Sequence, residues 1–153
     1  MISLVGAAGT GKTRLSKQLG LSELKRFEGR VWFCDLSNAT TSAEVLGAVS
    51  SALKVPLTHQ DPEAQLAAAI RGRGRSLFIL DNFEQVVDQA ALAVNDWLQK
   101  ASDAVFVVTS RRLLRIAGEE SFHLDPLPTR EACNLFYDRA RPVVNPSLYK
   151  AKS

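Results

Sequence analysis

A glycine-rich segment near the start of the chain has the residue types and the spacing to bind phosphate groups. Residues 6–13 read Gly-Ala-Ala-Gly-Thr-Gly-Lys-Thr, which is G-x-x-x-x-G-K-T, and they follow the apolar run of residues 1–5 directly. Such a loop can aim several backbone N–H groups at an anion, and the N-terminus of a following helix adds partial positive charge. Lys12 would contact the β- and γ-phosphates, and the Thr13 hydroxyl would ligate Mg²⁺. The residues expected to contact the ligand are Gly6, Ala7, Ala8, Gly9, Thr10, Gly11, Lys12, Thr13 and Arg14.

Two other interpretations of this segment are less favourable. A glycine-rich turn without a ligand would not need a strand-like run before it and a helix-like pattern after it. A dinucleotide-binding fingerprint requires a third glycine, whereas Gly9-Thr-Gly11 is followed by Lys12. The spacing therefore predicts a site for a nucleoside triphosphate.

An acidic residue ends another apolar run. Residues 77–80 read Leu-Phe-Ile-Leu and lead directly into Asp81. Ligands of open α/β sheets bind outside the carboxyl ends of the strands, so Asp81 would lie near the phosphate loop. Its carboxylate would hold Mg²⁺ through the water shell of the ion. The alternative is an aspartate that caps the next helix, but beside a complete phosphate loop the sequence favours the metal role.

An arginine has the corresponding place after the apolar run of residues 104–108. That run continues through Thr109 and Ser110 to Arg111. A guanidinium group can contact two phosphate oxygens at once, so Arg111 at this edge of the sheet would report whether a γ-phosphate is bound. A surface arginine on a loop is the alternative interpretation.

Hydrolysis would also need a base or a water-positioning group near the γ-phosphate. The residue after Asp81 is Asn82 rather than an acid, and Glu84 is the nearest carboxylate. Glu84 would either orient water or lie in the first helical turn, where it would interact favourably with the helix dipole. The sequence leaves both roles open. The candidate catalytic residues are Lys12, Asp81, Glu84 and Arg111.

Strand-like and helix-like patterns alternate along the chain. Apolar runs typical of parallel strands buried on both faces lie at 2–5, 31–36, 77–80 and 104–108, and a shorter fifth strand is expected at 121–124. Leucines and a phenylalanine at helical spacing predict a helix over 13–27. The helices expected further along begin with a capping box at 41–44, with Asp61-Pro62, before Val87, and at Thr129.

This alternation predicts an α/β fold of three layers, a P-loop nucleoside triphosphatase core built around a parallel sheet. The acid-bearing strand is third in the sequence, so a whole strand and the helices on either side of it separate it from the phosphate loop. That arrangement is consistent with the strand order 5-1-4-3-2, in which the strand that leads to Arg111 lies centrally.

The composition limits the class of protein. A chain of 153 residues with 46% hydrophobic and 23% charged residues is typical of one globular domain. No apolar run approaches the ~20 residues that span a bilayer, and the first run ends too early for a signal peptide. We therefore expect a cytoplasmic protein with no membrane contact. Cys34 and Cys133 lie far apart in apolar patterns and are expected to be reduced core residues.

The net charge of +3 raises the question of nucleic-acid binding. Two basic clusters exist, at residues 71–75 and at Arg111, Arg112 and Arg115. Neither has the interleaved aromatic residues of a base-stacking surface. We expect no direct nucleic-acid binding by this segment.

Together these motifs resemble the STAND class of signal-transduction ATPases, specifically the NB-ARC-like (AP-ATPase-like) domain of bacterial LuxR-type and SARP-type transcriptional regulators. In that family the arginine of the T-S-R stretch is a nucleotide sensor, which implies this role for Arg111. The resemblance covers about 135 of the 153 residues. It rests on GAAGTGKT at 6–13, RVWFCDLSNATTSAEVLGAVSSAL at 30–53, LFILDNFEQV at 77–86, VFVVTSRRLLRIAGEESFHLDPLP at 105–128 and EACNLF at 131–136.

The resemblance implies a nucleotide-binding core over residues 1–125 and the start of a helical lid over 126–141. Residues 142–153 include two prolines and a basic end, which predicts a loosely ordered tail. Members of the family have an upstream segment that helps to hold adenine, a full lid and further domains, so the chain resembles a member truncated at both ends. Other domains of a larger regulator, or a second copy, are the expected protein partners.

The function that accounts for most of these features is a regulatory switch that binds ATP or ADP with Mg²⁺ and hydrolyses ATP slowly or weakly. ATP bound through Lys12, Thr13, Asp81 and Arg111 would favour one arrangement of core and lid, and ADP another. A self-sufficient P-loop NTPase or small-molecule kinase is one alternative. An interaction module with a degenerate nucleotide site is another.

Overall fold

Runs of apolar residues form five strands in the computed structural model, which describes residues 1–140. All neighbouring strands are parallel, and they lie in the order β2-β3-β4-β1-β5. This is the predicted order 5-1-4-3-2 read from the other edge, so the prediction is confirmed. The strands are β1 (Ile2–Val5), β2 (Val31–Asp35), β3 (Ser76–Asp81), β4 (Ala104–Ser110) and β5 (Glu120–His123).

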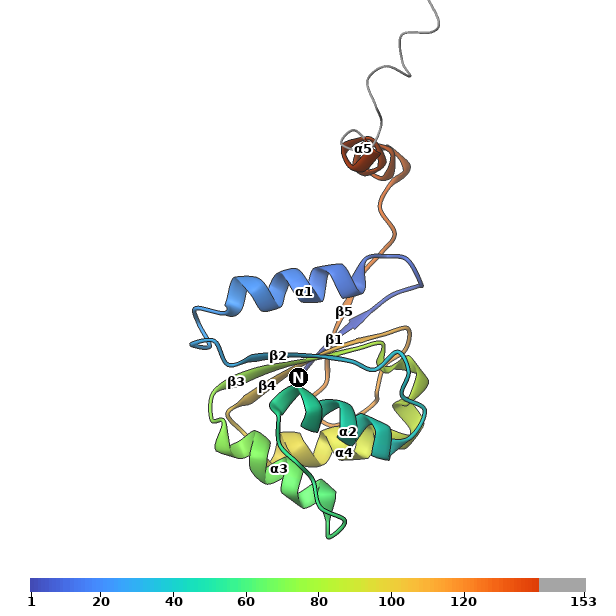
Figure 1. Ribbon diagram of the computed structural model, residues 1–153. Coiled ribbons are helices and arrows are strands. Elements are labelled where there is room, and N and C mark those ends of the chain that lie inside the picture. The colour runs from blue at the N-terminus through green and yellow to red at the C-terminus, as the bar shows by residue number, and fades with distance from the viewer. Residues whose placement is uncertain (141–153) are drawn as a thin grey trace, which may run out of the picture.

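Helices cover both faces of the sheet and complete three layers: α1 lies on one face, and α2, α3 and α4 lie on the other (Figure 1). The predicted start signals are confirmed. Thr41 and Glu44 form a capping box at the start of α2. At the start of α3, the Asp61 carboxylate accepts a hydrogen bond from the Ala64 N–H, and Pro62 is the first residue of the helix. The helical elements are α1 (Lys12–Glu23), α2 (Ser42–Leu53), α3 (Pro62–Gly72), the 3₁₀ turn η1 (Phe83–Gln85), α4 (Val87–Lys100) and α5 (Thr129–Ala140).

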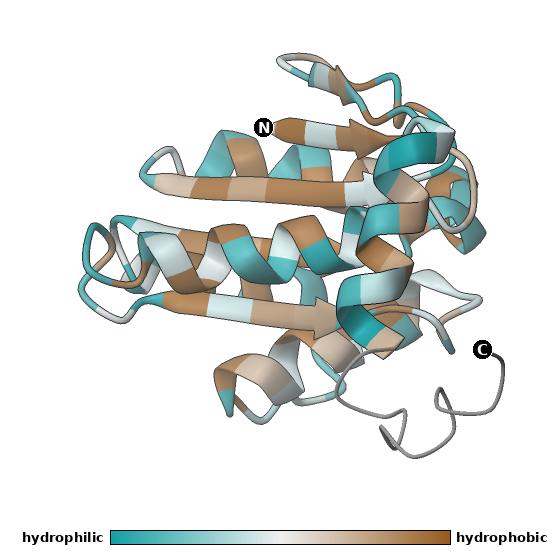
Figure 2. Ribbon diagram, turned by 90° about the horizontal axis from the view of Figure 1, so that it is seen from above, coloured by the Kyte–Doolittle hydropathy of each residue, from teal (hydrophilic) through white to brown (hydrophobic). Residues whose placement is uncertain are grey.

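The larger part of the apolar core lies between the sheet and helices α2 to α4. The strands are largely hydrophobic, as Figure 2 shows, and β3 is buried along its whole length, as expected. For β2 the expectation of burial on both faces is wrong. Residues 31–33 are only half-buried, because β2 is an edge strand with one neighbour.

Aromatic rings form a continuous stack on the face of the sheet that carries α4. The centroid distances are 5.0 Å from Trp32 to Phe78, 5.3 Å from Phe78 to Phe106, and 6.3 Å from Phe106 to Trp97. Phe78, Phe106 and Trp97 are fully buried. The stack therefore ties β2, β3 and β4 to α4 and fixes the strands whose ends form the candidate site.

Helix α1 packs on the sheet differently from the prediction. The periodicity over 13–27 predicts a longer helix with an apolar stripe, but α1 ends earlier, and Leu15 and Leu24 are exposed. Gly20 is buried in their place. A Cβ atom at Gly20 would lie 2.8 Å from Cδ1 of Ile79, so a small residue lets the helix come close to β3. The face of α1 that packs on the sheet thus carries mainly small residues, and of its leucines only Leu19 packs partly buried against the core.

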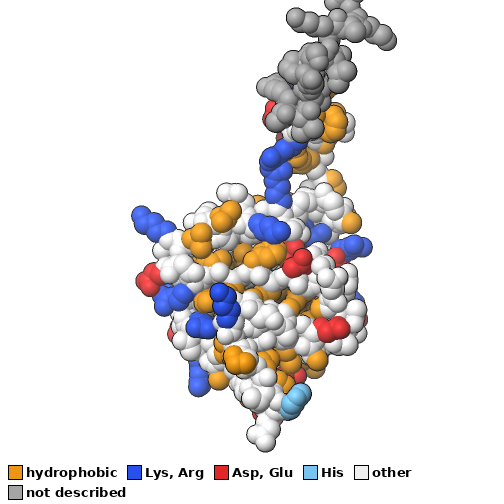
Figure 3. Space-filling model, viewed as in Figure 1, with side chains coloured by type: hydrophobic (Ala, Val, Ile, Leu, Met, Phe, Trp, Pro, Cys, Tyr) orange, Lys and Arg blue, Asp and Glu red, His pale blue; other side chains and the backbone are white. Residues whose placement is uncertain are grey.

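The two cysteines are free, but only one belongs to the core. Cys34 is buried in β2, and burial raises the pKa of its thiol to about 12. Cys133 is exposed, so the expectation of a core cysteine is wrong there. It lies on α5, which has no buried residue and stands away from the three layers, as Figures 1 and 3 show.

The predicted border between core and lid falls between β5 and α5 and stays a prediction. The predicted tail at 142–153, and the last residue of the predicted lid segment 126–141, lie outside the described residues. Within residues 1–140, none of the helices has the length and apolar character needed to cross a membrane.

Candidate phosphate-binding site

Two glycines meet requirements of the backbone in the loop between β1 and α1. A Cβ atom at Gly6 would lie 2.5 Å from the carbonyl oxygen of Leu124, so only glycine fits where this loop meets the end of β5. Gly11 has a φ of 93°, in the left-handed region that favours glycine. The glycine spacing in the sequence therefore reflects the shape of the loop.

The N-terminus of α1 opens onto the same loop. Its N-cap residue is Gly11, which provides no side-chain cap, and its first turn carries no acidic residue. The first N–H groups of a helix lack intrahelical acceptors and lie at the positive end of the helix dipole. This helix end can therefore bind an anion.

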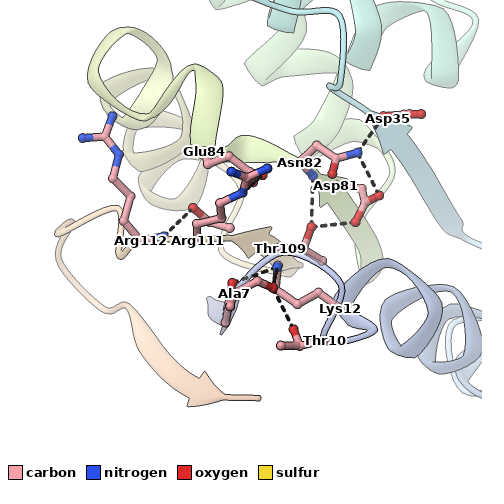
Figure 4. Close-up of polar contacts among 12 residues, drawn as sticks. Ala7, Thr10, Lys12, Asp35, Asp81, Asn82, Glu84, Thr109, Arg111 and Arg112 are labelled. Atoms are coloured by element: carbon pink, nitrogen blue, oxygen red, sulfur yellow. Dashed lines mark hydrogen bonds and ion pairs between the residues drawn. The ribbon is translucent and has the colours of Figure 1, made fainter. Parts of the chain in front are cut away.

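The side chain of Lys12 folds back into the loop. Its Nζ donates hydrogen bonds to the carbonyl oxygens of Gly6 and Ala7, each at 2.8 Å (Figure 4). The Thr10 hydroxyl donates to the Ala7 carbonyl oxygen at 3.0 Å. The ammonium group is thus held at the centre of the loop, where a bound phosphate would compete with these carbonyl oxygens for it.

Asp81 is the last residue of β3 and is almost completely buried. Its Oδ1 accepts a hydrogen bond of 2.6 Å from the Thr109 hydroxyl, and its Oδ2 accepts one of 3.2 Å from the Asn82 side-chain amide. A buried carboxylate is stable only with such partners. The neighbouring strand β4 therefore fixes the orientation of Asp81.

The side-chain amide of Asn82 also reaches β2. Its Nδ2 lies 3.1 Å from Oδ1 of Asp35, which also accepts a hydrogen bond of 2.9 Å from the Ser37 N–H. The hydrogen bond from the Ser37 backbone, followed by that from Asn82, lowers the pKa of the Asp35 carboxyl. Asp35 is therefore ionised at neutral pH and is connected through Asn82 to Asp81 (Figure 4).

Glu84 and Arg111 form an ion pair, with 3.1 Å between Oε1 and Nε. The Glu84 side chain is 15% exposed and that of Arg111 is 62% exposed. Oε2 of Glu84 is buried and has no hydrogen-bond partner among the described residues. The adjacent Arg112 pairs instead with Asp88 at 2.7 Å.

A cleft of about 590 Å³ brings most of the candidate residues together. Lys12, Asn82, Glu84 and Arg111 line it, although they come from α1, from the segment after β3 and from the end of β4. The predicted ligand contacts Ala8, Gly9, Gly11, Thr13 and Arg14 also line this cleft, as do Lys17, Gln18 and Leu21.

A second and more apolar cleft, of about 1020 Å³, adjoins the phosphate loop on its other side. One wall consists of loop and α1 residues, including Arg14 and Leu15. The other wall consists of residues around and within α5, namely Leu124, Pro126, Leu127, Ala132, Leu135, Phe136 and Arg139.

The donor atoms at this edge of the sheet fit Mg²⁺ by type. Mg²⁺ prefers oxygen ligands, keeps several of its waters and is usually held by one or two carboxylates together with substrate phosphates. Thr13 offers a half-buried hydroxyl beside Lys12, and Asp81 offers a carboxylate at the end of β3. These two residues would hold the ion.

The fold and this site define the class as an α/β P-loop nucleoside triphosphatase. The sheet has the expected parallel order, and the glycine-rich loop lies between β1 and α1. Residues 1–117 match the AAA domain family, and the chain therefore belongs to that family.

Relatives of known sequence include a candidate regulator of transcription. A candidate HTH-type transcriptional regulator of Mycobacterium tuberculosis is 33% identical over 148 residues, which is 94% of this chain and 16% of that protein. An uncharacterized protein of the same species is 30% identical over 144 residues, again 94% of this chain and 37% of that protein. The chain thus spans well under half the length of these relatives.

Solved structures of low sequence identity share the fold. A Drosophila ORC bound to DNA has a TM-score of 0.71 at 19% identity, over 93% of this chain and 42% of that one. The ORC2 protein of Aeropyrum pernix, in ADPNP and ADP complexes, has a TM-score of 0.64 at 18% identity, over 92% and 44%. A STAND protein with a tetratricopeptide repeat sensor from Pyrococcus horikoshii has a TM-score of 0.56 at 19% identity, over 94% and 23%. These likenesses show the fold, and none of them supports the expectation of no nucleic-acid binding.

Sequence reasoning missed Thr109 and Asp35 as members of the site. Both lie at carboxyl ends of strands that neighbour β3. Asp35 is the register partner of Asp81, and Thr109 follows the partner of Leu80. Once the strand order was predicted, polar residues at the ends of both neighbouring strands were the signal that could have identified them.

Proposed function

We propose that the chain is the nucleotide-dependent switch of a bacterial signal-transduction or transcription regulator, with an NB-ARC-like site of the STAND class and slow or weak ATP hydrolysis. The observation that carries this proposal is the shared cleft of Lys12 and Arg111. It combines a phosphate-binding loop with a cation on a different strand end. Such an arrangement can distinguish a triphosphate from a diphosphate.

The roles of the loop residues follow from their positions. Amides of the loop and of the first turn of α1 would hold the α- and β-phosphates, and Lys12 would move from the loop carbonyl oxygens to the β- and γ-phosphates. Thr13 and Asp81 would hold Mg²⁺, which would supply positive charge to the bound phosphates.

In this proposal the two states of the switch differ in the group that Arg111 contacts. Arg111 is paired with Glu84 at 3.1 Å in the structure. A γ-phosphate in the same cleft would compete for the guanidinium group, which is exposed enough to turn toward it. Released Glu84 would then be available to orient water.

The second cleft suits the base of the nucleotide. Its apolar side chains, among them Leu15, Leu127 and Phe136, would cover the two faces of an adenine ring. Because one wall belongs to α5, binding of the base would involve the predicted start of the lid. Movement of α5 could then reach other domains of a longer regulator, or a second copy.

Titration with Mg-ATP and Mg-ADP, combined with amide hydrogen exchange and a turnover assay, tests this function. We expect both nucleotides to bind, and we expect exchange in residues 124–140 to differ between the ATP and ADP complexes. Turnover should lie below the ~1 per second at which ordinary enzyme rates begin.

The other outcomes of this experiment favour the alternative functions. Turnover at ordinary rates, to water or to a small acceptor, would indicate a self-sufficient NTPase or kinase. Absence of binding by either nucleotide would indicate an interaction module with a degenerate site.

A further inference from the structure

The β4–β5 loop, residues 111–119, begins in the nucleotide site. Its first residue, Arg111, lines the phosphate cleft and pairs with Glu84. Leu114, further along, is buried in the larger apolar core. The last residue of the loop is Glu119, directly before β5. The loop therefore carries the candidate sensor at one end and a carboxylate at the other.

Glu119 holds the loop through three hydrogen bonds. Its Oε1 accepts from the Ser3 hydroxyl at 2.6 Å and from the Leu114 N–H at 3.0 Å, and its Oε2 accepts from the Arg115 N–H at 2.7 Å. Hydrogen bonds from backbone N–H groups to a carboxylate are among the stronger ones in proteins. Arg115 has a φ of 57°, in the left-handed region that costs a non-glycine residue energy. The contacts of Glu119 offset this cost and keep the loop in one conformation.

The contact with Ser3 joins the β4–β5 loop to the strand that leads into the phosphate loop. Ser3 is fully buried in β1, where its hydroxyl needs a hydrogen-bond partner. β1 ends at Val5, and the phosphate loop begins with the next residue, Gly6. Glu119 does not line the cleft, but its carboxylate fixes the β4–β5 loop relative to the phosphate loop.

We propose that Glu119 is the positioning residue of Arg111: by fixing the β4–β5 loop on β1, it places the guanidinium group where it meets the γ-phosphate of ATP. The role rests on the proposed function, in which Arg111 contacts that phosphate, and deepens it by naming the residue on which the discrimination of ATP from ADP depends. ADP lacks the γ-phosphate, so its affinity should be independent of Glu119.

The variant Glu119→Gln tests this role with little change in shape. An amide has an acceptor oxygen and a donor nitrogen, so its nitrogen would face the N–H of either Leu114 or Arg115. The loop would lose about one hydrogen bond. We expect the calorimetric Kd for Mg-ATP to rise about fivefold, the factor that one typical hydrogen bond is worth, and the Kd for Mg-ADP to stay within about twofold of wild type.

Glu120→Gln is the matched control, because it removes the same charge one residue further on, where the side chain is exposed. Loss of a negative charge by itself favours the binding of an anion. A pure charge effect would therefore lower the Kd for both nucleotides, which is opposite in sign to the effect expected for Glu119→Gln. We expect both Kd values of Glu120→Gln to stay within about twofold of wild type.

Combination with Arg111→Ala tests whether Glu119 acts through Arg111. A residue that acts only through another has no effect once the other is gone, and a double-mutant cycle measures this coupling. We expect Glu119→Gln/Arg111→Ala to bind Mg-ATP within about twofold of Arg111→Ala alone.

Ser3→Ala tests the connection to β1 without a change of charge. It removes the hydroxyl that contacts Oε1 of Glu119 and leaves the two backbone hydrogen bonds in place. We expect the Kd for Mg-ATP to rise about threefold, with that for Mg-ADP within about twofold of wild type. Thermal unfolding shows which variants are folded, and Ser3→Ala is the deciding variant if Glu119→Gln does not fold.

The outcomes separate this role from the function on which it rests. If wild type does not bind Mg-ATP, or if Arg111→Ala weakens both nucleotides equally, the proposed function is wrong. If Arg111→Ala weakens Mg-ATP alone while the deciding variant changes neither Kd, or both equally, the role of Glu119 is wrong. A fivefold effect of Glu119→Gln that persists without Arg111 would overturn it as well.

Discussion

Replacing Lys12 with alanine is expected to weaken Mg-ATP binding by about tenfold to a hundredfold, because a charge-assisted contact is worth about 1.5–3 kcal/mol. Lys12 is the cation at the centre of the phosphate loop, where its Nζ lies 2.8 Å from two carbonyl oxygens. Because the phosphate contact replaces those hydrogen bonds, we expect the increase in Kd to lie nearer tenfold than a hundredfold. Calorimetric titration of wild type and Lys12→Ala measures the ratio.

Lys17→Ala is the matched control for this experiment. Lys17 lines the same cleft, but its Nζ lies 4.7 Å from the centroid of the Phe33 ring and outside the phosphate loop. We expect its Kd for Mg-ATP to stay within about threefold of wild type, as for an exposed charge. Equal Kd values for wild type and Lys12→Ala would contradict the assignment of the loop.

The second large effect is expected in the core. Phe78→Ala should lower the free energy of unfolding by about 3–5 kcal/mol, as for buried phenylalanines in general. Phe78 is fully buried in β3 and stacks with Trp32 on one side and Phe106 on the other, at 5.0 and 5.3 Å. Its removal leaves a cavity between the rings of Trp32 and Phe106, on the face of the sheet that carries α4.

Denaturant unfolding measures this loss, with Phe122→Ala as the control. Phe122 lies on the edge strand β5 and is 56% exposed, so its removal should change the free energy of unfolding by less than about 0.5 kcal/mol. A loss below about 1 kcal/mol for Phe78→Ala, with an unchanged m-value, would show that the aromatic stack does not hold the sheet together.

Much of the fold could be predicted because local signals and topology agreed. The apolar run of residues 77–80, the capping box at Thr41 and the order of the acid-bearing strand all pointed to the same parallel sheet, which the structure confirms. The packing face of α1 could not be predicted from leucine periodicity. Gly20 packs on Ile79 there, and a close approach through a missing Cβ leaves no hydrophobic pattern in the sequence.

The candidate site was predictable where one segment supplies the contacts and less so where several do. The loop at residues 6–13 follows from its own sequence. The hydrogen bonds from Thr109 to Asp81 and from Asn82 to Asp35 join residues 28 and 47 positions apart, and they depend on strand register. The pairing of Arg111 with Glu84 likewise depends on side-chain directions that no spacing in the sequence defines.

The most direct test of the proposed switch compares Mg-ATP and Mg-ADP binding by wild type and Arg111→Ala in one calorimetric series. If Arg111 reads the γ-phosphate, its loss should weaken Mg-ATP binding by about tenfold and leave the Kd for Mg-ADP unchanged within about twofold, because only ATP offers the group that the guanidinium contacts. An equal change for both nucleotides, or no change for either, would contradict this account.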